Sequence, residues 1–389
     1  MRIAQIGFYR DPADRDPEEL LDAWPTLVDV AESVTAAGTG VSVIQSSGHS
    51  RYFRRKEVDY HFLPLMRRRL QLPVQESFAE LIRAMAPQVL HVHGLGFPEE
   101  VLLMEQAAPG IPILLQDHAN RPPRWWRRSA WKRCGQTIAG VAFCHRHQAR
   151  PFIEDGVLAR HTPVYEIPES TSRFVPADRE AARRDTGVAG DPLLLWVGHL
   201  DGNKDPLTVL DAVAAAAREL PDLQLWCCFG TAPLQRQVQR RIASDRLLDG
   251  RVHLLGAVSH ARVEQLMRAA DFFISGSHRE STGYALIEAL ACGLPPLVTD
   301  IPSFRALTAE GAVGQLWRAG DAPSLCSALL RMGPRATPAD RAAVRQHFER
   351  ELSFEALGHK LTAAYADLVR RDERASYACP QPGKTAMPA

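Results

Sequence analysis

The sequence predicts an α/β protein built from two Rossmann-like, doubly wound domains that face each other across a cleft. Short apolar runs alternate with stretches of helical periodicity, which is typical of a parallel sheet covered by helices. The alternation occurs in two successive series, separated by a stretch dotted with Pro, Ser and Gly at about 167–190. A length of 389 residues also favours two large domains over one. Ligands of such folds bind at the carboxyl ends of the strands.

The first series predicts a five-stranded sheet. Its strands are expected at Ile3–Phe8, Val41–Gln45, Val89–His93, Ile113–Gln116 and Val141–Cys144. Helices are expected at Glu18–Ala37, which ends at Gly38, and at Phe78–Met85, which ends before Pro87.

The second series predicts a similar sheet. Its strands are expected at Leu193–Val197, Leu223–Phe229, Val252–Leu254, Phe272–Ile274 and Pro296–Val298. The helices between them are expected at Pro206–Leu220, Leu234–Leu247, Val263–Ala270 and Tyr284–Cys292. The predicted domains are therefore 1–180 and 181–352, followed by a last helix at 353–371 and a polar, Pro-containing tail at 372–389 that we expect to be disordered.

Composition excludes several classes of protein. The formal net charge of +1 argues against a dedicated nucleic-acid binder. No window approaches the ~18 apolar residues of a membrane span and the N-terminus has no signal-peptide pattern, so we expect a cytoplasmic location. The seven cysteines are scattered without a C-x-x-C pair, which disfavours disulfides and zinc. Asp14-Arg15-Asp16 resembles a metal-holding Asp-x-Asp, but a solvated acidic loop is the favoured interpretation.

Charge is unevenly distributed within the neutral total. Arg51–Leu70 holds seven basic and two acidic residues, and Arg121–Arg133 holds six basic residues and no acidic one. The second segment interleaves three tryptophans with its arginines, a combination that suits an anionic membrane surface or a phosphate-bearing acceptor. The alternative is a solvated helix whose tryptophans pack into the domain.

A candidate anion site follows the first strand of the second series. Gly198, at the strand's carboxyl end, lets a ligand approach the backbone. His199 comes next, and Lys204 precedes a helix that begins near Asp205-Pro206. A helix N-terminus and a lysine together suit a diphosphate.

A second cluster follows the strand at Phe272–Ile274. Glu280 lies on the loop and Glu288 about a turn into the next helix, so the two carboxylates can address different parts of one ligand. The amides at Ser281–Gly283 can donate to hydroxyls or to phosphate oxygens. Each part alone could be structural, since Glu288 could be a surface residue and Lys204 a solvated charge.

These segments resemble retaining glycosyltransferases of family 4, which have the GT-B fold. Gly198–Lys204 is similar to their G-R-L-D-x-x-K element, and Ser277–Gly293 is similar to S-x-x-E-G-F-G-x-x-x-x-E-A-x-A-C-G. Weaker similarities lie at Pro87–Gly94, Gln116–Ala119 and Ile167–Pro176. The resemblance implies a last helix that crosses back onto the first domain. It also implies metal-independent transfer of a hexose, without a cofactor, from a nucleotide-diphosphate sugar to a hydroxyl acceptor with retention of configuration.

The resemblance also implies roles for individual residues. Lys204 would contact the donor diphosphate, Glu288 would hold the ribose hydroxyls, and Glu280 would lie close to the transferred sugar. Gly198 and His199 would also belong to the donor site, and backbone donors would come from Ser281, Thr282 and Gly283. In the first domain, His118 would face the reacting sugar.

Further contacts are expected around these groups. The loop at Gly256–Val258 would lie against the base of the nucleotide. His91 and His93 are weaker candidates for a contact with acceptor or sugar. The resemblance leaves open whether the acceptor is a glycan, a lipid-linked glycan or a small molecule, and whether the segment Arg121–Arg133 contacts the inner face of an anionic membrane.

Departures from the family pattern affect three places. His199 stands where the family has arginine, which replaces a permanent cation with a pH-dependent one unless Arg279 compensates. Ser281 and Thr282 replace a glycine and an aromatic residue. The glycine-rich loop expected after the first strand reads Phe8-Tyr9-Arg10-Asp11-Pro12. A catalytically impaired protein that binds a nucleotide sugar, a GT-B epimerase and a GT-B phosphorylase therefore remain as alternatives.

Overall fold

The computed structural model describes residues 1–64, 72–118 and 121–378. The chain folds into two compact units. The first comprises Met1–Glu169 together with the chain from Leu357 onward, and the second comprises Ser170–Ala356. Residues 170–180, which the sequence assigned to the first domain, therefore lie in the second unit. Each unit has its own sheet and its own core.

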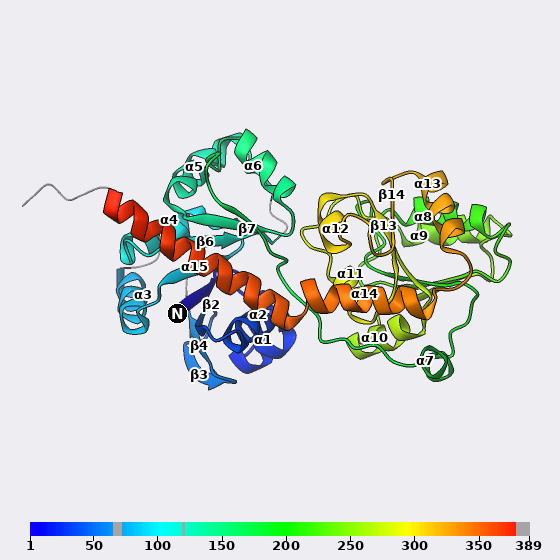
Figure 1. Cartoon of the computed structure of the whole chain (residues 1–389), viewed down its shortest axis with the longest axis horizontal. Coiled ribbons are helices and arrows are strands. Elements are labelled where there is room, and N and C mark those ends of the chain that lie inside the picture. Colours follow the sequence, from blue (N-terminus) through cyan, green and yellow to red (C-terminus); the bar gives the residue numbers. More distant parts are fainter. Residues whose placement is uncertain (65–71, 119–120, 379–389) are drawn as a thin grey trace, which may run out of the picture. The chain divides into compact units, whose positions relative to one another are not determined.

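Within the described residues, the first unit contains an eight-stranded sheet (Figure 1). The strand order is β3-β4-β2-β1-β5-β6-β7-β8, and every pair of neighbours is parallel except β3 and β4. The strands are β1 Arg2–Gly7, β2 Gly40–Ser46, β3 Arg51–Arg55, β4 Val58–Leu63, β5 Val89–His93, β6 Ile113–Gln116, β7 Gly140–Phe143 and β8 Val164–Glu166.

Three of these strands were not predicted. β3 and β4 form a hairpin whose two-residue turn, Lys56-Glu57, has positive φ at both positions. Turn residues of this type are normally Gly or Asn, so the usual hairpin signal is missing. β3 carries three arginines at the sheet edge, where charge prevents further pairing. β8 is a three-residue edge strand with little pattern to detect.

Helices cover both faces of this sheet. One core lies under α3 Leu72–Met85, α4 Pro98–Ala107, α5 Arg128–Thr137 and α6 Arg150–Glu154, and the other lies under α1 Pro17–Ala23, α2 Pro25–Ala36 and α15 Phe354–Ala378. The single helix predicted at Glu18–Ala37 is therefore two. The backbone of Trp24 is not helical, and Pro25, which has no N–H to donate, starts the second helix.

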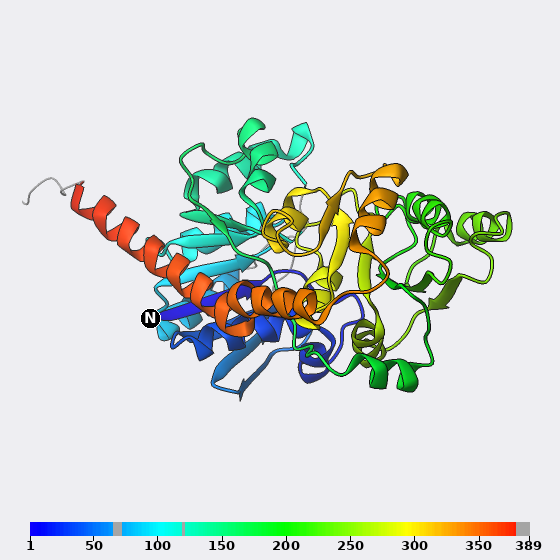
Figure 2. The same ribbon diagram turned by 45° about the vertical axis from the view of Figure 1, so that its right-hand side comes forward.

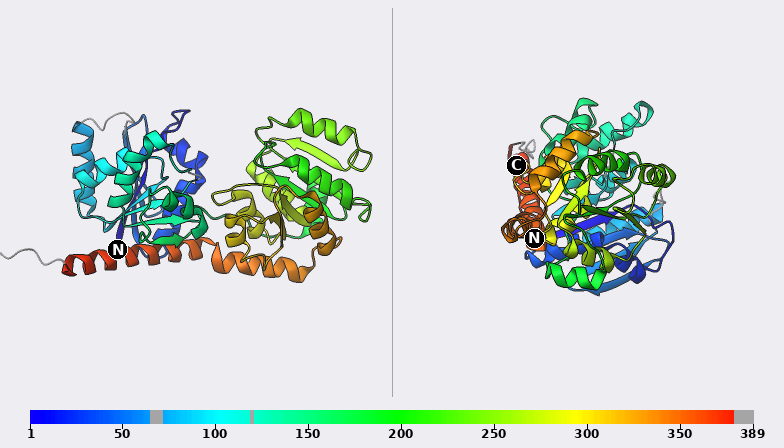
Figure 3. Two further views of the ribbon diagram at one scale, coloured as in Figure 1. Left: turned by 90° about the horizontal axis from the view of Figure 1, so that it is seen from above. Right: turned by 90° about the vertical axis from the view of Figure 1, so that its right-hand side faces the viewer.

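The long helix α15 belongs to the first unit, which confirms the predicted crossing back (Figures 2 and 3). It buries Leu357, Leu361 and Leu368 in the core shared with α1 and α2. A Cβ at Gly358 would lie 2.2 Å from the carbonyl oxygen of Ser33, so this glycine is needed for close packing against α2. The helix continues to Ala378, beyond the predicted end at Arg371, because no proline or glycine occurs between Arg371 and Pro380. Residues 379–389 of the predicted tail lie outside the described residues.

The second unit contains six described strands in the order β11-β10-β9-β12-β13-β14, all parallel. In chain order this is 3-2-1-4-5-6, the order of a doubly wound nucleotide-binding sheet. The predicted fold class is thus confirmed. The strands are β9 Leu193–Val197, β10 Gln224–Cys228, β11 Val252–Gly256, β12 Phe272–Ser275, β13 Pro296–Thr299 and the unpredicted β14 Gln315–Trp317.

Helices also cover both faces of this second sheet. The core of one face lies under α8 Pro206–Ala216, α9 Gln235–Ala243 and α13 Ala322–Met332. α7 Arg179–Thr186 contacts α10 His260–Ala269, and α14 Pro338–Glu351 contacts α11 Tyr284–Ala291, which also contacts α12 Pro302–Leu307. No helix within the described residues is both long enough and apolar enough to cross a bilayer.

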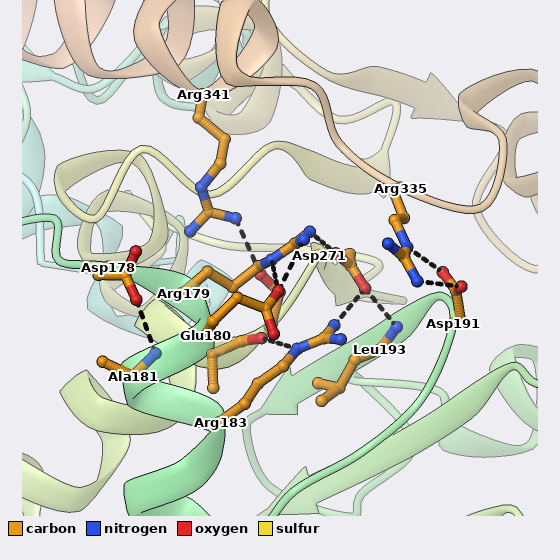
Figure 4. A network of polar contacts seen from close by, with 12 residues as sticks. Asp178, Arg179, Glu180, Ala181, Arg183, Asp191, Leu193, Asp271, Arg335 and Arg341 are labelled. Carbon is orange, nitrogen blue, oxygen red and sulfur yellow. Dashed lines mark hydrogen bonds and ion pairs between the residues drawn. The ribbon is translucent and has the colours of Figure 1, made fainter.

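A buried carboxylate joins the amino ends of two central strands of the second unit. Asp271 immediately precedes β12 and is fully buried. It accepts hydrogen bonds from the guanidinium groups of Arg179 and Arg183 and from the Leu193 N–H, at 2.5 to 2.7 Å (Figure 4). Burial lowers the pKa of the nearby Arg341, whose side chain donates to the Ala270 carbonyl. This network fixes α7 at the amino ends of the strands, opposite to the carboxyl ends at which ligands bind.

Candidate active site

A pocket of about 370 Å³ lies at the carboxyl ends of β9 and β12. The strand order reverses between these two neighbours, and ligands of open α/β sheets bind at this position. The sequence-predicted residues that line it are Gly198, His199, Lys204, Ala257, Val258, Glu280, Gly283 and Glu288. The structure thus brings together groups that lie up to 90 residues apart in the chain.

Hydrogen bonds join the loop after β9 to the loop after β12 beside this pocket. The His278 N–H donates to the Asn203 backbone carbonyl at 2.8 Å, and the side-chain amide of Asn203 donates to the Arg279 carbonyl at 3.0 Å. Gly276 makes the approach possible, because a Cβ there would lie 2.7 Å from the carbonyl oxygen of Lys204. This close approach is what places the loop after β9 beside the loop after β12.

Lys204 and Glu280 form an ion pair within the pocket. Asp201 fixes the lysine loop by accepting hydrogen bonds from the N–H groups of Asn203 and Lys204, both at 2.9 Å. The Lys204 and Glu280 side chains are 23% and 15% exposed, so the pair is partly shielded from water. An anionic ligand in this pocket would compete with Glu280 for the lysine.

Glu288 also has a partner, one that the sequence did not predict. His260 Nε2 lies 2.5 Å from Glu288 Oε1. His260 is the first residue of α10, and its ring lies tilted against that of Phe174, with 4.6 Å between the ring centroids. Nothing in the spacing of residues 260 and 288 indicates this contact, which only the packing of α10 beside α11 creates.

His199 uses one ring nitrogen as a hydrogen-bond acceptor in this structure. The backbone N–H of Thr231 donates to His199 Nδ1 at 3.2 Å. A nitrogen that accepts a hydrogen bond carries no proton, so Nδ1 offers no N–H to an anion in this geometry. Arg279, suggested from the sequence as a compensating cation, does not line the pocket. Lys204 is therefore the cationic side chain that the structure brings to the described pocket lining.

The segment at Ser281–Gly283 reaches the pocket through its last residue. Gly283 lines the pocket with φ of +106°, and a Cβ there would lie 2.6 Å from the ring of Phe304. Thr282 is buried, and neither it nor Ser281 lines the pocket. The glycine is thus required by geometry, whereas Ser281 and Thr282, the two positions that depart from the family pattern, lie outside the described pocket lining.

The first unit has a pocket of its own, of about 400 Å³, at the ends of β1 and β5. The strand order of that sheet also reverses at this pair. Its wall includes the predicted His118 and the weaker candidate His93, together with Tyr9, Trp24, Thr26, Leu27, Gln45, Phe97, Glu169 and glycines 7, 94 and 96. His91 does not line it and is fully buried, with Nδ1 2.7 Å from the Tyr365 hydroxyl.

The unusual loop after β1 contributes an aromatic wall. Tyr9 lies against Trp24, with 5.6 Å between the ring centroids. The Gln45 amide donates to the Tyr9 carbonyl at 2.7 Å and fixes the loop. The close approach depends on Gly7, the last residue of the strand, because a Cβ there would lie 2.1 Å from Gln45 Oε1. A glycine is therefore present at this strand end, one residue before the segment Phe8–Pro12 that stands where the family has its glycine-rich loop.

Three polar side chains form a chain along the pocket wall. Glu169 Oε2 lies 2.9 Å from His118 Nδ1, and His118 Nε2 lies 3.2 Å from His93 Nδ1. Glu169 is 5% exposed and His118 is 32% exposed. Burial, together with His91 and His118, lowers the pKa of His93 well below its ordinary value, so His93 is neutral. The sequence analysis missed Glu169, although it lies in the segment Ile167–Pro176 that carried a weak resemblance.

The acidic loop near the first strand is accounted for by local contacts. Asp14 pairs with Arg10 at 3.0 Å. Asp16 accepts the N–H of Glu18 at the start of α1 and pairs with Arg51. These contacts agree with the structural interpretation of Asp14-Arg15-Asp16.

Comparison with known proteins identifies the second unit. Residues 178–332 match the family described as Glycosyl transferases group 1. This chain carries a glycosyl transferases group 1 domain. The match covers the pocket formed by Lys204, Glu280 and Glu288, so the predicted family is confirmed for the unit that contains that pocket.

Two glycosyltransferases have sequences similar to this chain. A D-inositol 3-phosphate glycosyltransferase of Geodermatophilus obscurus is 31% identical over 248 residues, which are 59% of this chain and 53% of the relative. A GDP-mannose:cellobiosyl-diphosphopolyprenol alpha-mannosyltransferase of Xanthomonas oryzae is 25% identical over 250 residues, or 62% of this chain and 63% of the relative. The chain thus spans less than two thirds of the length of either relative.

The likeness extends to the fold of the whole chain. The structure of sucrose-phosphate synthase from Thermosynechococcus elongatus matches with a TM-score of 0.67 at 20% identity, covering 95% of this chain and 99% of that one. The fold of the chain, including the group 1 domain, is therefore GT-B, as predicted.

Proposed function

We propose that this protein is a retaining hexosyltransferase that moves a sugar from a nucleotide-diphosphate donor to a hydroxyl acceptor. The observation that carries the proposal is the convergence of Lys204, Glu280 and Glu288 in one pocket at the strand-order reversal of the group 1 domain. One cation and two carboxylates at separate positions fit the three parts of such a donor, which are diphosphate, sugar and ribose.

The donor would lie across this pocket in a defined direction. Lys204 and the backbone at Gly198 would bind the diphosphate near the N-terminus of α11, where the helix dipole favours anions. Glu288 would accept hydrogen bonds from the ribose hydroxyls once it leaves His260. Ala257 and Val258 offer apolar surface for the base. Glu280 would then be left for the sugar when the diphosphate takes Lys204.

The chemistry follows from the charges that develop when the anomeric bond breaks. Positive charge builds on the sugar and negative charge builds on the departing diphosphate. Lys204 opposes the second of these charges, and the Glu280 carboxylate favours the first. The acceptor hydroxyl attacks from the face that the leaving group vacates, and a diphosphate oxygen takes the proton, so configuration is retained.

The pocket of the first unit would hold the acceptor. Its aromatic side chains Tyr9 and Trp24 suit the apolar face of a sugar ring, and the His118–Glu169 pair suits its hydroxyls. The names of the two relatives specify different acceptors, an inositol phosphate and a lipid-linked sugar diphosphate. We propose a sugar or polyol hydroxyl as the acceptor group and the cytoplasmic side of the membrane as the place of action.

A panel of donors tests the proposal. Thermal unfolding is measured with UDP-, GDP-, ADP- and dTDP-sugars, because a ligand that binds the native state raises the melting temperature. Release of nucleotide from labelled donor is then followed for the wild type, Glu280→Ala and the control Glu219→Ala, an exposed residue of the same unit. We expect stabilisation by one nucleotide class, and turnover that Glu280→Ala abolishes and the control retains.

Other outcomes would assign a different function. Stabilisation by a nucleotide sugar without turnover under any acceptor would indicate a binding protein. Conversion of the donor to an isomeric nucleotide sugar would indicate an epimerase, and turnover that requires inorganic phosphate would indicate a phosphorylase. No thermal shift with any donor would overturn the whole proposal.

A further inference from the structure

The segment Arg121–Arg133 exposes two of its three tryptophans. Trp131 is 7% exposed and stacks on Phe152, with 6.1 Å between the ring centroids. Trp125 and Trp126 lie on a single 3-10 turn and are 76% and 56% exposed. Indole side chains bury large apolar areas elsewhere in proteins, so two adjacent exposed rings indicate a contact with something outside the unit.

Most of the cations around this turn have no carboxylate partner within the described residues. Arg121, Arg124, Arg127, Lys132 and Arg133 are exposed, and within the described part of the chain none forms an ion pair. Arg124 lies over the Trp126 ring at 5.2 Å from its centroid. Arg128 is the exception, because it pairs with Asp155 at 2.8 Å. We call Trp125, Trp126 and these five exposed cations the Trp–Arg patch.

The described part of the other basic stretch, residues 51–64, differs in this respect, and the three arginines at 67–69 lie outside the described residues. In β3 and its turn, each cation pairs with a carboxylate. Arg51 pairs with Asp16 and Glu18, Arg54 with Glu57, Arg55 with Asp22, and Lys56 with Glu32. The exposed Tyr52 of this strand donates to Asp59 at 2.9 Å. Similar composition therefore produces a neutralised surface at β3 and an unneutralised one at the Trp–Arg patch.

We propose that the Trp–Arg patch docks the first unit onto an anionic lipid bilayer. Indole rings are favoured at the headgroup level of a membrane, where the apolar ring is buried and the N–H stays near water. Unpaired cations beside them add attraction to anionic lipid. This partner deepens the proposed function by supplying a place where a lipid-linked acceptor would be met, although docking itself requires no catalysis.

Vesicle flotation with the full chain tests the docking. The wild type is mixed with vesicles of phosphatidylcholine alone, or with vesicles in which about one lipid in three is the anionic phosphatidylglycerol. We expect binding to the anionic vesicles and loss of binding as salt rises. Arg124→Ser combined with Arg127→Ser should weaken partitioning by roughly 25-fold, since each cation near an anionic surface contributes about fivefold. Trp125→Ala combined with Trp126→Ala should remove most of the rest.

Tyr52→Ala is the matched control, because it removes an exposed aromatic side chain from the neutralised stretch. We expect it to bind as the wild type does. Equal binding of the tryptophan variant and the wild type, or equal binding to neutral and anionic vesicles, would overturn the proposal. So would lipid-free self-association, seen by light scattering, that the tryptophan variant loses. Nucleotide release without vesicles should be the same in this variant and the wild type, which separates failed docking from failed catalysis.

Discussion

Glu169 holds the imidazole of His118 by a contact of 2.9 Å between Oε2 and Nδ1. A carboxylate only accepts, so the proton of this contact lies on His118 Nδ1 and the tautomer of the ring is fixed. His118 Nε2 then faces His93 and the pocket of the first unit. Glu169 is therefore a positioning residue for a histidine that the proposed reaction uses.

Glu169→Gln should lower the turnover number and leave the KM for the donor unchanged. The amide keeps the shape of the carboxylate but not its charge, so it supports His118 less well. The expected loss is on the order of tenfold to a hundredfold, which is the contribution of one hydrogen bond to a charged group. Steady-state kinetics with the donor identified by thermal shift measures both constants.

A double-mutant cycle with His118→Ala provides the decisive control for this prediction. If Glu169 acts through His118, the glutamine variant should cost nothing further once the imidazole is gone. Glu166→Gln removes an exposed carboxylate paired with Arg146 in the same segment and should have no effect. Additive losses from Glu169→Gln and His118→Ala would contradict the positioning role.

Gly276→Ala should separate the two loops that form the donor pocket. Its Cβ would lie 2.7 Å from the carbonyl of Lys204, and a backbone oxygen cannot move aside without moving the loop. The expected cost is about 1–3 kcal/mol of stability, as for other overpacked sites, together with weaker donor binding. Urea unfolding and donor titration measure the two effects.

Gly202→Ala is a matched control for this change, because it lies in the same loop and a Cβ there would have no atom within 4 Å. We expect near-wild-type stability and donor affinity from it. Equal behaviour of the two alanine variants would show that the approach of the loops does not depend on Gly276.

The stability of the first unit should fall when the pH is lowered from 6.5. Burial, with a smaller contribution from His118, lowers the pKa of His91 to about 3, and burial also lowers the pKa of His93. In the unfolded chain both groups take up a proton near the ordinary value of 6.5, whereas the folded chain resists protonation. Stability is therefore present above pH 6.5 and is lost toward pH 3, by about 1 kcal/mol per histidine for each pH unit.

Urea unfolding of the wild type and His93→Gln at several pH values between 4.5 and 7.5, a range of roughly three units around the ordinary histidine pKa, measures this dependence. The variant should lose part of the slope, while the exposed control His147→Gln should keep it. A slope in His93→Gln as steep as in the wild type would mean that other groups account for the acid sensitivity.

The sequence by itself determined the two series of strands, because buried parallel strands are short, continuous apolar runs that helical periodicity separates. It also predicted that Lys204, Glu280 and Glu288 lie near one another, since their loops follow strand ends, and all three line one pocket. Local pattern could not reveal β3, whose arginines suit an edge, or the break at Trp24, where a proline starts a new helix.

Tertiary structure decided which polar groups meet. Glu169 reaches His118 across 51 positions of the chain, and His260 reaches Glu288 across 28, distances at which sequence spacing carries no information about contact. It also decided that the described cations of β3 and its turn are neutralised while those of the Trp–Arg patch are not, because an arginine is neutralised only where folding brings a carboxylate to it. The net charge of +1 contains no trace of that difference between β3 and the Trp–Arg patch.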